Sequence, residues 1–213
     1  MIPKKIHYCW FGNNEYSTLI KRCIETWNDK LPGWEFILWN EDNSPMEHPF
    51  VQKAMRDGKY AFVSDYVRCY ALYTYGGVYL DTDMEVLKDI DPLRSLVAFL
   101  APEDISGESL SCGVMGAEKN HKLYSEMLEY YGENLTYTPI PLIISRIIKN
   151  KKISISVLPR ESFYPYNPFD KAQDVKQLML SDITNETYAI HHWNFSWKLS
   201  FLENIFMRIK KLF

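Results

Sequence analysis

The segment formed by residues 61–85 constrains the fold more than any other, because a helix, a glycine pair, a strand and acidic residues follow one another within it. Glycine is common just past the end of a helix, so the helix is expected to stop at residues 76–77. The strand after them is apolar until Asp81, and Asp83 follows two positions later. Such a strand delivers its carboxylates to the carboxyl edge of a sheet, where α/β proteins bind ligands. The segment therefore predicts an α/β domain with an acidic site at that edge.

Strands and helices alternate along the rest of the chain. Strands are expected at about 2–9, 34–39, 78–81, 97–101, 112–117, 153–157 and 187–193, and helices at about 17–30, 50–57, 61–75, 123–131 and 140–148. This alternation is typical of a three-layer α/β domain with a mostly parallel central sheet flanked by helices. With 213 residues, of which 46% are hydrophobic and 24% charged, the chain can bury the core of one soluble domain. We assign this domain to residues 1–197.

Charge, cysteine content and hydropathy narrow the function classes. A net charge of −3 offers no general attraction for nucleic acid. The four cysteines form no C-x-x-C pair, so free buried thiols in a reducing cytosol are expected. No signal peptide is recognisable, and no apolar stretch approaches the roughly 18 residues that span a bilayer. We expect a cytoplasmic protein.

The C-terminal residues 198–213 read as a separate basic amphipathic helix. Apolar residues recur there at helical spacing, and four basic residues stand against one acidic residue. Two interpretations stay open. The helix could lie in an anionic headgroup layer on the inner face of the cell membrane, which would make the protein peripheral. Alternatively, it could dock on the core with its cations at the negative end of the helix dipole.

The D-T-D motif suggests a divalent-cation site. On an ideal strand, Asp81 and Asp83 would be about 6–7 Å apart, whereas a divalent ion such as Mg²⁺ binds oxygens at about 2.0–2.1 Å. One aspartate would then be a direct ligand and the other would act through water or on the substrate, unless the chain bends at Thr82. The alternative is a solvated acidic turn, because an isolated D-x-D occurs often by chance.

Asp65 and Arg68 lie three positions apart on the preceding helix and therefore share a face. As a surface ion pair they would contribute under about 1 kcal/mol to stability. Because their helix leads into the strand that carries Asp81, the pair could instead reach the same pocket. There it would supply an acceptor for hydroxyl groups and a fork for oxyanions.

Three blocks of the sequence together resemble one known family. The run from Ser64 to Val86 resembles the signature of the DXD-containing glycosyltransferase family 32, which includes bacterial capsular-polysaccharide enzymes and is related to the clostridial glucosylating toxins. Residues 2–12 resemble the family's first strand and nucleotide-binding loop, and residues 189–198 resemble its closing metal and phosphate segment. The resemblance implies a single GT-A-like, Rossmann-like domain.

The resemblance also implies a reaction. The enzyme would be a metal-dependent, retaining glycosyltransferase that moves a sugar from a nucleotide-sugar, with a UDP-sugar favoured, to a glycan or lipid-linked oligosaccharide acceptor in surface polysaccharide synthesis. Cleavage of the sugar–phosphate bond leaves charge on a diphosphate, which a divalent ion neutralises. By resemblance, Asp81 and Asp83 are the catalytic and metal-binding carboxylates, and His191 completes the site, with His192 open as the alternative. An imidazole ligand favours Mn²⁺ over Mg²⁺.

The remaining residues carried over by the resemblance would bind the nucleotide-sugar. Trp10 would stack on the base, Asp65 and Arg68 would hold the sugar or ribose, and Ser196 and Trp197 would close over the diphosphate.

Two other classes of protein are alternatives to a glycosyltransferase. A phosphatase of the haloacid-dehalogenase type also uses D-x-D at the end of a strand, but there the motif follows the first strand and needs a downstream acidic partner that is not recognisable here. The other class is a noncatalytic glycan- or nucleotide-binding protein. The sequence offers no support for it, because the expected metal and donor positions are intact.

Overall fold

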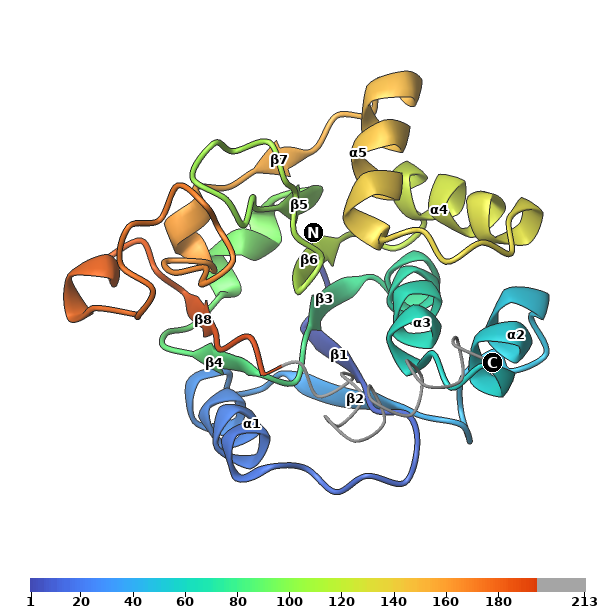
Figure 1. The fold of residues 1–213 in the computed structure, drawn as a ribbon, viewed down its shortest axis with the longest axis horizontal. Helices are drawn as coiled ribbons and strands as arrows, with labels where there is room; N and C mark the ends of the chain where they lie inside the picture. Colours follow the sequence, from blue (N-terminus) through green and yellow to red (C-terminus); the bar gives the residue numbers. More distant parts are fainter. Residues whose placement is uncertain (195–213) are drawn as a thin grey trace, which may run out of the picture.

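The main sheet of the protein has six strands in the order β2-β1-β3-β6-β5-β7. The computed structural model describes residues 1–194 and is drawn in Figure 1. The strands are β1 (Lys5–Cys9), β2 (Glu35–Trp39), β3 (Gly77–Leu80), β5 (Ala98–Leu100), β6 (Val114–Ala117) and β7 (Ser156–Val157). All run in one direction except β6, which is antiparallel to both of its neighbours. The expectation of a mostly parallel α/β sheet is confirmed, and β6 is its exception.

Helices cover both faces of the main sheet. They are α1 (Thr18–Lys30), α2 (Pro49–Arg56), α3 (Tyr60–Tyr75), α4 (Lys122–Glu133) and α5 (Ile140–Lys151), with short 3₁₀ turns at 91–95, 160–162 and 180–182. One buried apolar cluster joins α2, α3, α4 and α5 to one face of the sheet, and a second joins α1 to the other. Figure 1 shows this division, with α1 set apart from the other helices. The helices predicted from the sequence agree with the five helices of residues 1–194 to within a few residues.

A second sheet was not expected from the sequence. It consists of β4 (Met84–Val86) and β8 (Ala189–His191), which pair antiparallel so that Met84 lies opposite His191. We call it the small sheet. The expected final strand at 187–193 is shortened to β8, and β4 begins directly after the D-T-D motif. The chain therefore leaves the main sheet after Leu80, passes through the three residues of the motif, and enters the small sheet at Met84.

The turn between α3 and β3 needs its two glycines. Gly76 and Gly77 have φ angles of +64° and +115°, which residues with side chains rarely adopt. A Cβ atom at Gly77 would also lie 2.6 Å from the backbone oxygen of Lys5 on β1. The glycine pair thus allows α3 to pass into β3 directly beside β1.

A buried histidine ties this turn to the first two strands. His7 Nε2 lies 2.8 Å from the backbone oxygen of Gly76, and Trp39 Nε1 donates to His7 Nδ1 at 3.1 Å. Burial lowers the pKa of His7 to about 4. The ring is therefore neutral, and it donates from Nε2 and accepts at Nδ1. These bonds fix the start of β3 relative to β1 and β2.

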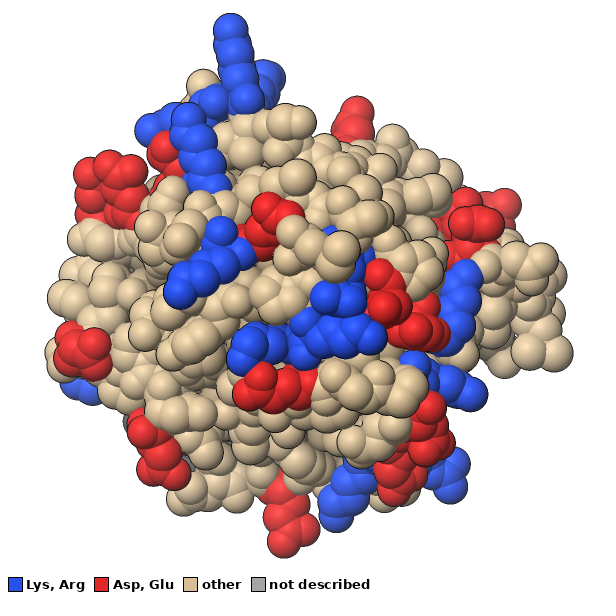
Figure 2. Space-filling model, turned by 180° about the vertical axis from the view of Figure 1, so that it is seen from behind, with Lys and Arg blue, Asp and Glu red and all other residues tan. Residues whose placement is uncertain are grey.

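The remaining structural expectations concern the surface and the cysteines. Figure 2 shows Lys and Arg side chains next to Asp and Glu side chains on the face seen from behind. All four cysteines are buried and free. Within residues 1–194, no helix is long and apolar enough to cross a membrane. The helix predicted at 198–213 lies outside the described residues.

Candidate metal and donor site

The carboxyl ends of β2, β1 and β3 meet at one edge of the main sheet. The strands are in parallel register, with Cys9 opposite Trp39 and His7 opposite Tyr79. Trp10 directly follows β1 and Asp81 directly follows β3, so both lie at this edge. The backbone N–H of Asp81 donates to the backbone oxygen of Gly113, which directly precedes β6, at 2.8 Å. The location predicted for the acidic site is thus the edge where ligands bind in α/β folds.

The chain bends sharply after Asp81. Residues 82–83 form a turn, closed by the backbone N–H of Met84, which donates to the Asp81 carbonyl at 3.1 Å. One ligand atom each from Asp81, Asp83 and His191 therefore lies within 4.8 Å of the others. Asp83 is only 8% exposed, so the motif is not a solvated turn. Of the alternatives that the sequence left open, the bend at Thr82 is the one observed.

Asp83 and His191 hold one another in place. His191 Nε2 lies 3.2 Å from Asp83 Oδ1, and the backbone N–H of Asn194 donates to Asp83 Oδ2 at 2.7 Å. Burial raises the pKa of the Asp83 carboxyl, but these hydrogen bonds and the His191 charge outweigh it and leave the pKa lowered. Burial lowers the pKa of His191, and the bond to Asp83 more than reverses this. Both shifts favour the charged forms and therefore favour an ion pair between Asp83 and His191.

The His191 ring contacts two aromatic side chains. The Trp193 ring lies 4.1 Å away, and the Tyr164 ring meets it edge-on at 5.7 Å. Within residues 1–194, buried His191 Nδ1 has no hydrogen-bond partner. Two carboxylates and an oriented imidazole form a mixed oxygen and nitrogen donor set of the kind that binds divalent metal ions. Asp81, Asp83 and His191 could therefore hold a divalent ion.

The neighbouring histidine belongs to a different cluster. His192 Nε2 lies 2.7 Å from Glu85 Oε2 on β4. Successive residues of an extended segment point to opposite sides, so His191 and His192 cannot both face the aspartates. In the part of the chain that the structure describes, the potential metal-binding group includes His191 and not His192.

Arg68 lies beneath the aspartates and is 7% exposed. Its Nη2 is 3.4 Å from both Asp65 Oδ1 and Asp81 Oδ1, and its Nη1 donates to the backbone oxygen of Cys112 at 2.7 Å. The guanidinium also lies over the Tyr79 ring, 4.3 Å from its centre. Tyr79 Oη donates to Asp81 Oδ1 at 3.0 Å. Arg68 thus joins α3 to the end of β3.

Asp65 is buried as well, so it does not form the surface ion pair that the sequence left open. Burial raises the pKa of its carboxyl to about 7, although the charge of Arg68 opposes this. A carboxyl with this pKa can be present in either protonation state near neutral pH. It can therefore either accept or donate a hydrogen bond to a hydroxyl group.

Trp10 is partly exposed at the end of β1. Its Nε1 donates to the backbone oxygen of Asn14 at 2.7 Å, which fixes the ring in its loop. Tyr16 packs edge-on against it, with ring centres 4.7 Å apart. Tyr16 was missed by the sequence reasoning, although its place in the same aromatic loop was a usable signal. Ser196 and Trp197 lie outside the described residues, so their predicted contacts with the diphosphate stay predictions.

Several residues near the site gave no local sequence signal. Gly113 lies against Asp81, because a Cβ atom there would be 3.0 Å from Asp81 Oδ2 and 3.1 Å from Tyr164 Oη. Tyr164 Oη accepts from the backbone N–H of Val114 at 2.9 Å. Burial raises the pKa of Glu103, on the loop after β5, and His191 is one of the charges that act on it. These residues come from the middle of the chain, where no site residue was predicted.

The fold resembles the GT-A fold of solved glycosyltransferases. Among solved structures, the chain resembles the PaToxG glycosyltransferase with a TM-score of 0.57 and 17% sequence identity, over 70% of each chain. Residues 17–100 match a protein family described as the glycosyltransferase sugar-binding region containing a DXD motif. The matched range includes Asp65, Arg68 and both aspartates of D-T-D, and it ends before His191.

Two fungal proteins show the likeness at the sequence level. The mannosyl phosphorylinositol ceramide synthase CSH1 of Saccharomyces cerevisiae is 30% identical over 170 residues, which cover 71% of this chain and 44% of the relative. The inositol phosphoceramide mannosyltransferase 3 of Schizosaccharomyces pombe is 27% identical over 228 residues, which cover 94% of this chain and 62% of the relative. The chain therefore spans less than two thirds of either relative.

Proposed function

We propose that this chain is a metal-dependent glycosyltransferase that uses a nucleotide-sugar donor. The observation that carries the proposal is the meeting of Asp81, Asp83 and His191 within 4.8 Å, at the ligand-binding edge of a GT-A fold. The family match over the D-T-D motif and the two related transferases support the same class of reaction. A phosphatase of the haloacid-dehalogenase type would account for the paired aspartates but not for the family match.

The residues at the edge divide the work of binding and charge stabilisation. Asp81, Asp83 and His191 would hold a divalent ion, with Mn²⁺ favoured over Mg²⁺ by the imidazole, and that ion would supply positive charge to the departing diphosphate. Arg68, fixed by two carboxylates and a carbonyl, adds a permanent positive charge below Asp81. Asp65 exchanges hydrogen bonds with a hydroxyl of the donor. Trp10 offers an aromatic face to the base.

The donor and acceptor classes follow from the resemblance and the relatives. A UDP-sugar is the favoured donor, and transfer with retention of configuration is expected. The relatives are named for transfer to ceramide lipids, which agrees with a glycan or lipid-linked oligosaccharide acceptor. A role in surface polysaccharide synthesis, of the bacterial capsular type and with a distant relation to the clostridial toxins, is part of this proposal.

The first experiment measures donor hydrolysis by the purified chain. A panel of UDP- and GDP-sugars is incubated with Mn²⁺, and release of the nucleotide diphosphate is followed. Hydrolysis of one donor, abolished by EDTA and by Asp83→Ala, is the expected result. Turnover near that of the wild type by the Asp83→Ala variant would contradict the metal site. Release of inorganic phosphate from generic phosphoesters would favour the phosphatase instead.

A separate proposal concerns location. A cytoplasmic protein that acts on a lipid-linked acceptor would work at the inner face of the membrane, and the basic residues after 197 suit an anionic surface. Flotation with vesicles that contain anionic lipid is expected to recover the full chain and not a chain truncated after Lys198. Equal recovery of the two, both shown to be folded by circular dichroism, would refute the proposal.

A further inference from the structure

The small sheet carries most of the candidate site but has little hydrogen bonding of its own. Asp83 directly precedes β4, and His191 ends β8 opposite Met84. An isolated two-stranded sheet is marginally stable in water. Only one edge of β4 pairs with β8, so the carbonyl of Met84 and the N–H of Val86 point away from that partner. These are two of the backbone groups that a third strand would bond.

Two side chains of α1 occupy the place of that third strand. Trp27 Nε1 donates to the Met84 carbonyl at 2.6 Å. Thr26 Oγ1 accepts from the Val86 N–H at 2.9 Å and donates its own proton to the backbone oxygen of Cys23 at 2.6 Å. These two groups on the free edge of β4 are therefore bonded to α1, and the donor and acceptor roles of the Thr26 hydroxyl are fixed.

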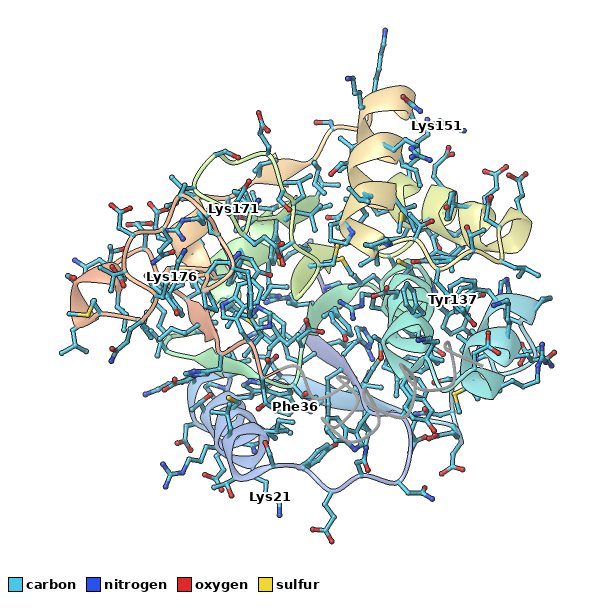
Figure 3. All side chains as sticks on the ribbon, in the orientation of Figure 1. Lys21, Phe36, Tyr137, Lys151, Lys171 and Lys176 are labelled. Atoms are coloured by element: carbon cyan, nitrogen blue, oxygen red, sulfur yellow. The ribbon has the colours of Figure 1, made fainter. Side chains whose placement is uncertain are left out.

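Trp27 also anchors this arrangement to the main sheet. The side chain is 1% exposed, with its ring edge-on to Tyr8 of β1 at 5.3 Å and stacked with Phe36 of β2 at 6.5 Å. Phe36 is labelled beside α1 in Figure 3. One indole thus contacts the main sheet with its ring and the small sheet with its N–H.

The division of the candidate ligands between two sheets makes this link consequential. Asp81 belongs to the end of β3 in the main sheet, whereas Asp83 and His191 belong to the small sheet. The turn at residues 82–83 joins Asp81 to Asp83, whereas the distance from Asp81 to His191 also depends on what holds one sheet against the other. We propose that Thr26 and Trp27 are positioning residues that hold β4 in register against the main sheet and thereby set the spacing of the three ligands.

This inference rests on the proposed metal site for its functional meaning, but its structural content can be measured alone. A packing role for α1 would be satisfied by any side chains of similar shape. A positioning role requires the two polar contacts themselves. The variants must therefore separate shape from hydrogen bonding.

Four variants of the full chain provide that separation. Thr26→Val keeps the shape and removes both hydrogen bonds, whereas Thr26→Ser keeps the hydroxyl. Trp27→Phe keeps an aromatic ring and removes the N–H. Ile20→Val is the matched control, because it removes one methyl group from a buried position on the same helix. Amide hydrogen exchange is followed in peptides that cover β4 and β8, and Mn²⁺ affinity is measured by electron paramagnetic resonance.

Thr26→Val and Trp27→Phe are each expected to speed exchange in β4 and to weaken Mn²⁺ binding by about tenfold, because each leaves one backbone group of β4 without its hydrogen bond. Thr26→Ser and Ile20→Val should stay within about twofold of the wild type. Unchanged exchange in Thr26→Val, or an equal increase in Ile20→Val, would overturn the proposal. If Asp83→Ala binds Mn²⁺ as well as the wild type, the proposed metal site fails, and the exchange results still decide the role of Thr26 and Trp27.

Discussion

The two halves of the candidate site are built in different ways. In the main-sheet half, Asp81 is bonded by Tyr79 and Gly113 and lies 3.4 Å from buried Arg68. In the small-sheet half, Asp83 and His191 are bonded chiefly to each other and to the backbone that follows β8. The first half carries its own permanent counter-charge. In the second half, the positive charge comes from protonated His191. A bound divalent ion would take over this role as the counter-charge of Asp83.

This difference teaches which half should depend on a cation. Arg68 balances Asp81 whether or not a cation is present, so the main-sheet half is preformed. If His191 Nε2 bound a metal ion, Asp83 would lose the His191 charge as its partner. We therefore expect substitutions in the main-sheet half to act first on stability, and substitutions in the small-sheet half to act first on metal affinity.

Removal of Arg68 is expected to have the largest effect. Arg68→Met leaves buried Asp65 and partly exposed Asp81 without a counter-charge, which is expected to cost about 3 kcal/mol in the free energy of unfolding, the low end for breaking a buried ion pair. The matched control is Lys53→Met, which removes the exposed ion pair with Asp57 and should leave the free energy of unfolding nearly unchanged. Urea unfolding at neutral pH measures both. Similar losses for the two variants would show that the main-sheet half is not held by its buried arginine.

The two histidines offer a sharper test of the small-sheet half. His191→Ala removes a predicted ligand and is expected to weaken Mn²⁺ binding by about a hundredfold, the upper end of what loss of a supporting residue costs. His192→Ala removes only the contact with Glu85 and should change the affinity by less than about threefold. Titration calorimetry with Mn²⁺ distinguishes them. A larger loss in His192→Ala would reassign the ligand to the other histidine.

What could be predicted from the sequence corresponds to what is local in the structure. The helix ending at Gly76, the strand leading to Asp81 and the aromatic loop at Trp10 are set by nearby residues, and all were located. The small sheet was missed because β4 has three residues and owes its existence to β8 and to α1, both distant in sequence. The spacing of the site residues depends on those long-range contacts.

The same reasoning explains why Gly113 escaped notice. Its role arises only when β6 lies antiparallel beside β3, and no nearby sequence pattern announces that pairing. Glu103 and Tyr164 are comparable, because burial of their polar groups next to the site depends on loops far apart in the chain. The roles assigned to Asp81, Asp83 and His191 stay predictions, although the structure brings the three side chains together.

A substitution at Gly113 tests whether Asp81, in the main-sheet half, contributes to Mn²⁺ binding together with the small-sheet half. Gly113→Ala adds a Cβ atom 3.0 Å from Asp81 Oδ2, so the carboxylate has to shift by several tenths of an ångström. A shift of one ligand in a preformed site is expected to weaken Mn²⁺ binding by about tenfold. Gly132→Ala, where nothing lies within 4 Å of the new atom, is the control. Equal affinities in the two variants would mean that Asp81 does not contact the ion.

The smallest expected effect concerns Asp65, the buried carboxyl of the main-sheet half. Its pKa is raised from 3.8 to about 7 by burial, against the attraction of Arg68. Between these values the folded chain holds a proton that the unfolded chain has released, so the stability associated with Asp65 is complete below about pH 4 and is lost as the pH rises through about 7.

Asp65→Asn removes this titration and keeps the size of the side chain. As the pH rises from about 6 to about 8, the free energy of unfolding of the wild type should fall by about 1 kcal/mol relative to that of the variant. Urea unfolding of both proteins at several pH values in this range measures the difference, and all other titrating groups cancel in the comparison. A difference that stays constant across this pH range would mean that Arg68 holds Asp65 ionised. The main-sheet half would then contain two charged carboxylates around one arginine, and its net charge would be negative even before a donor binds.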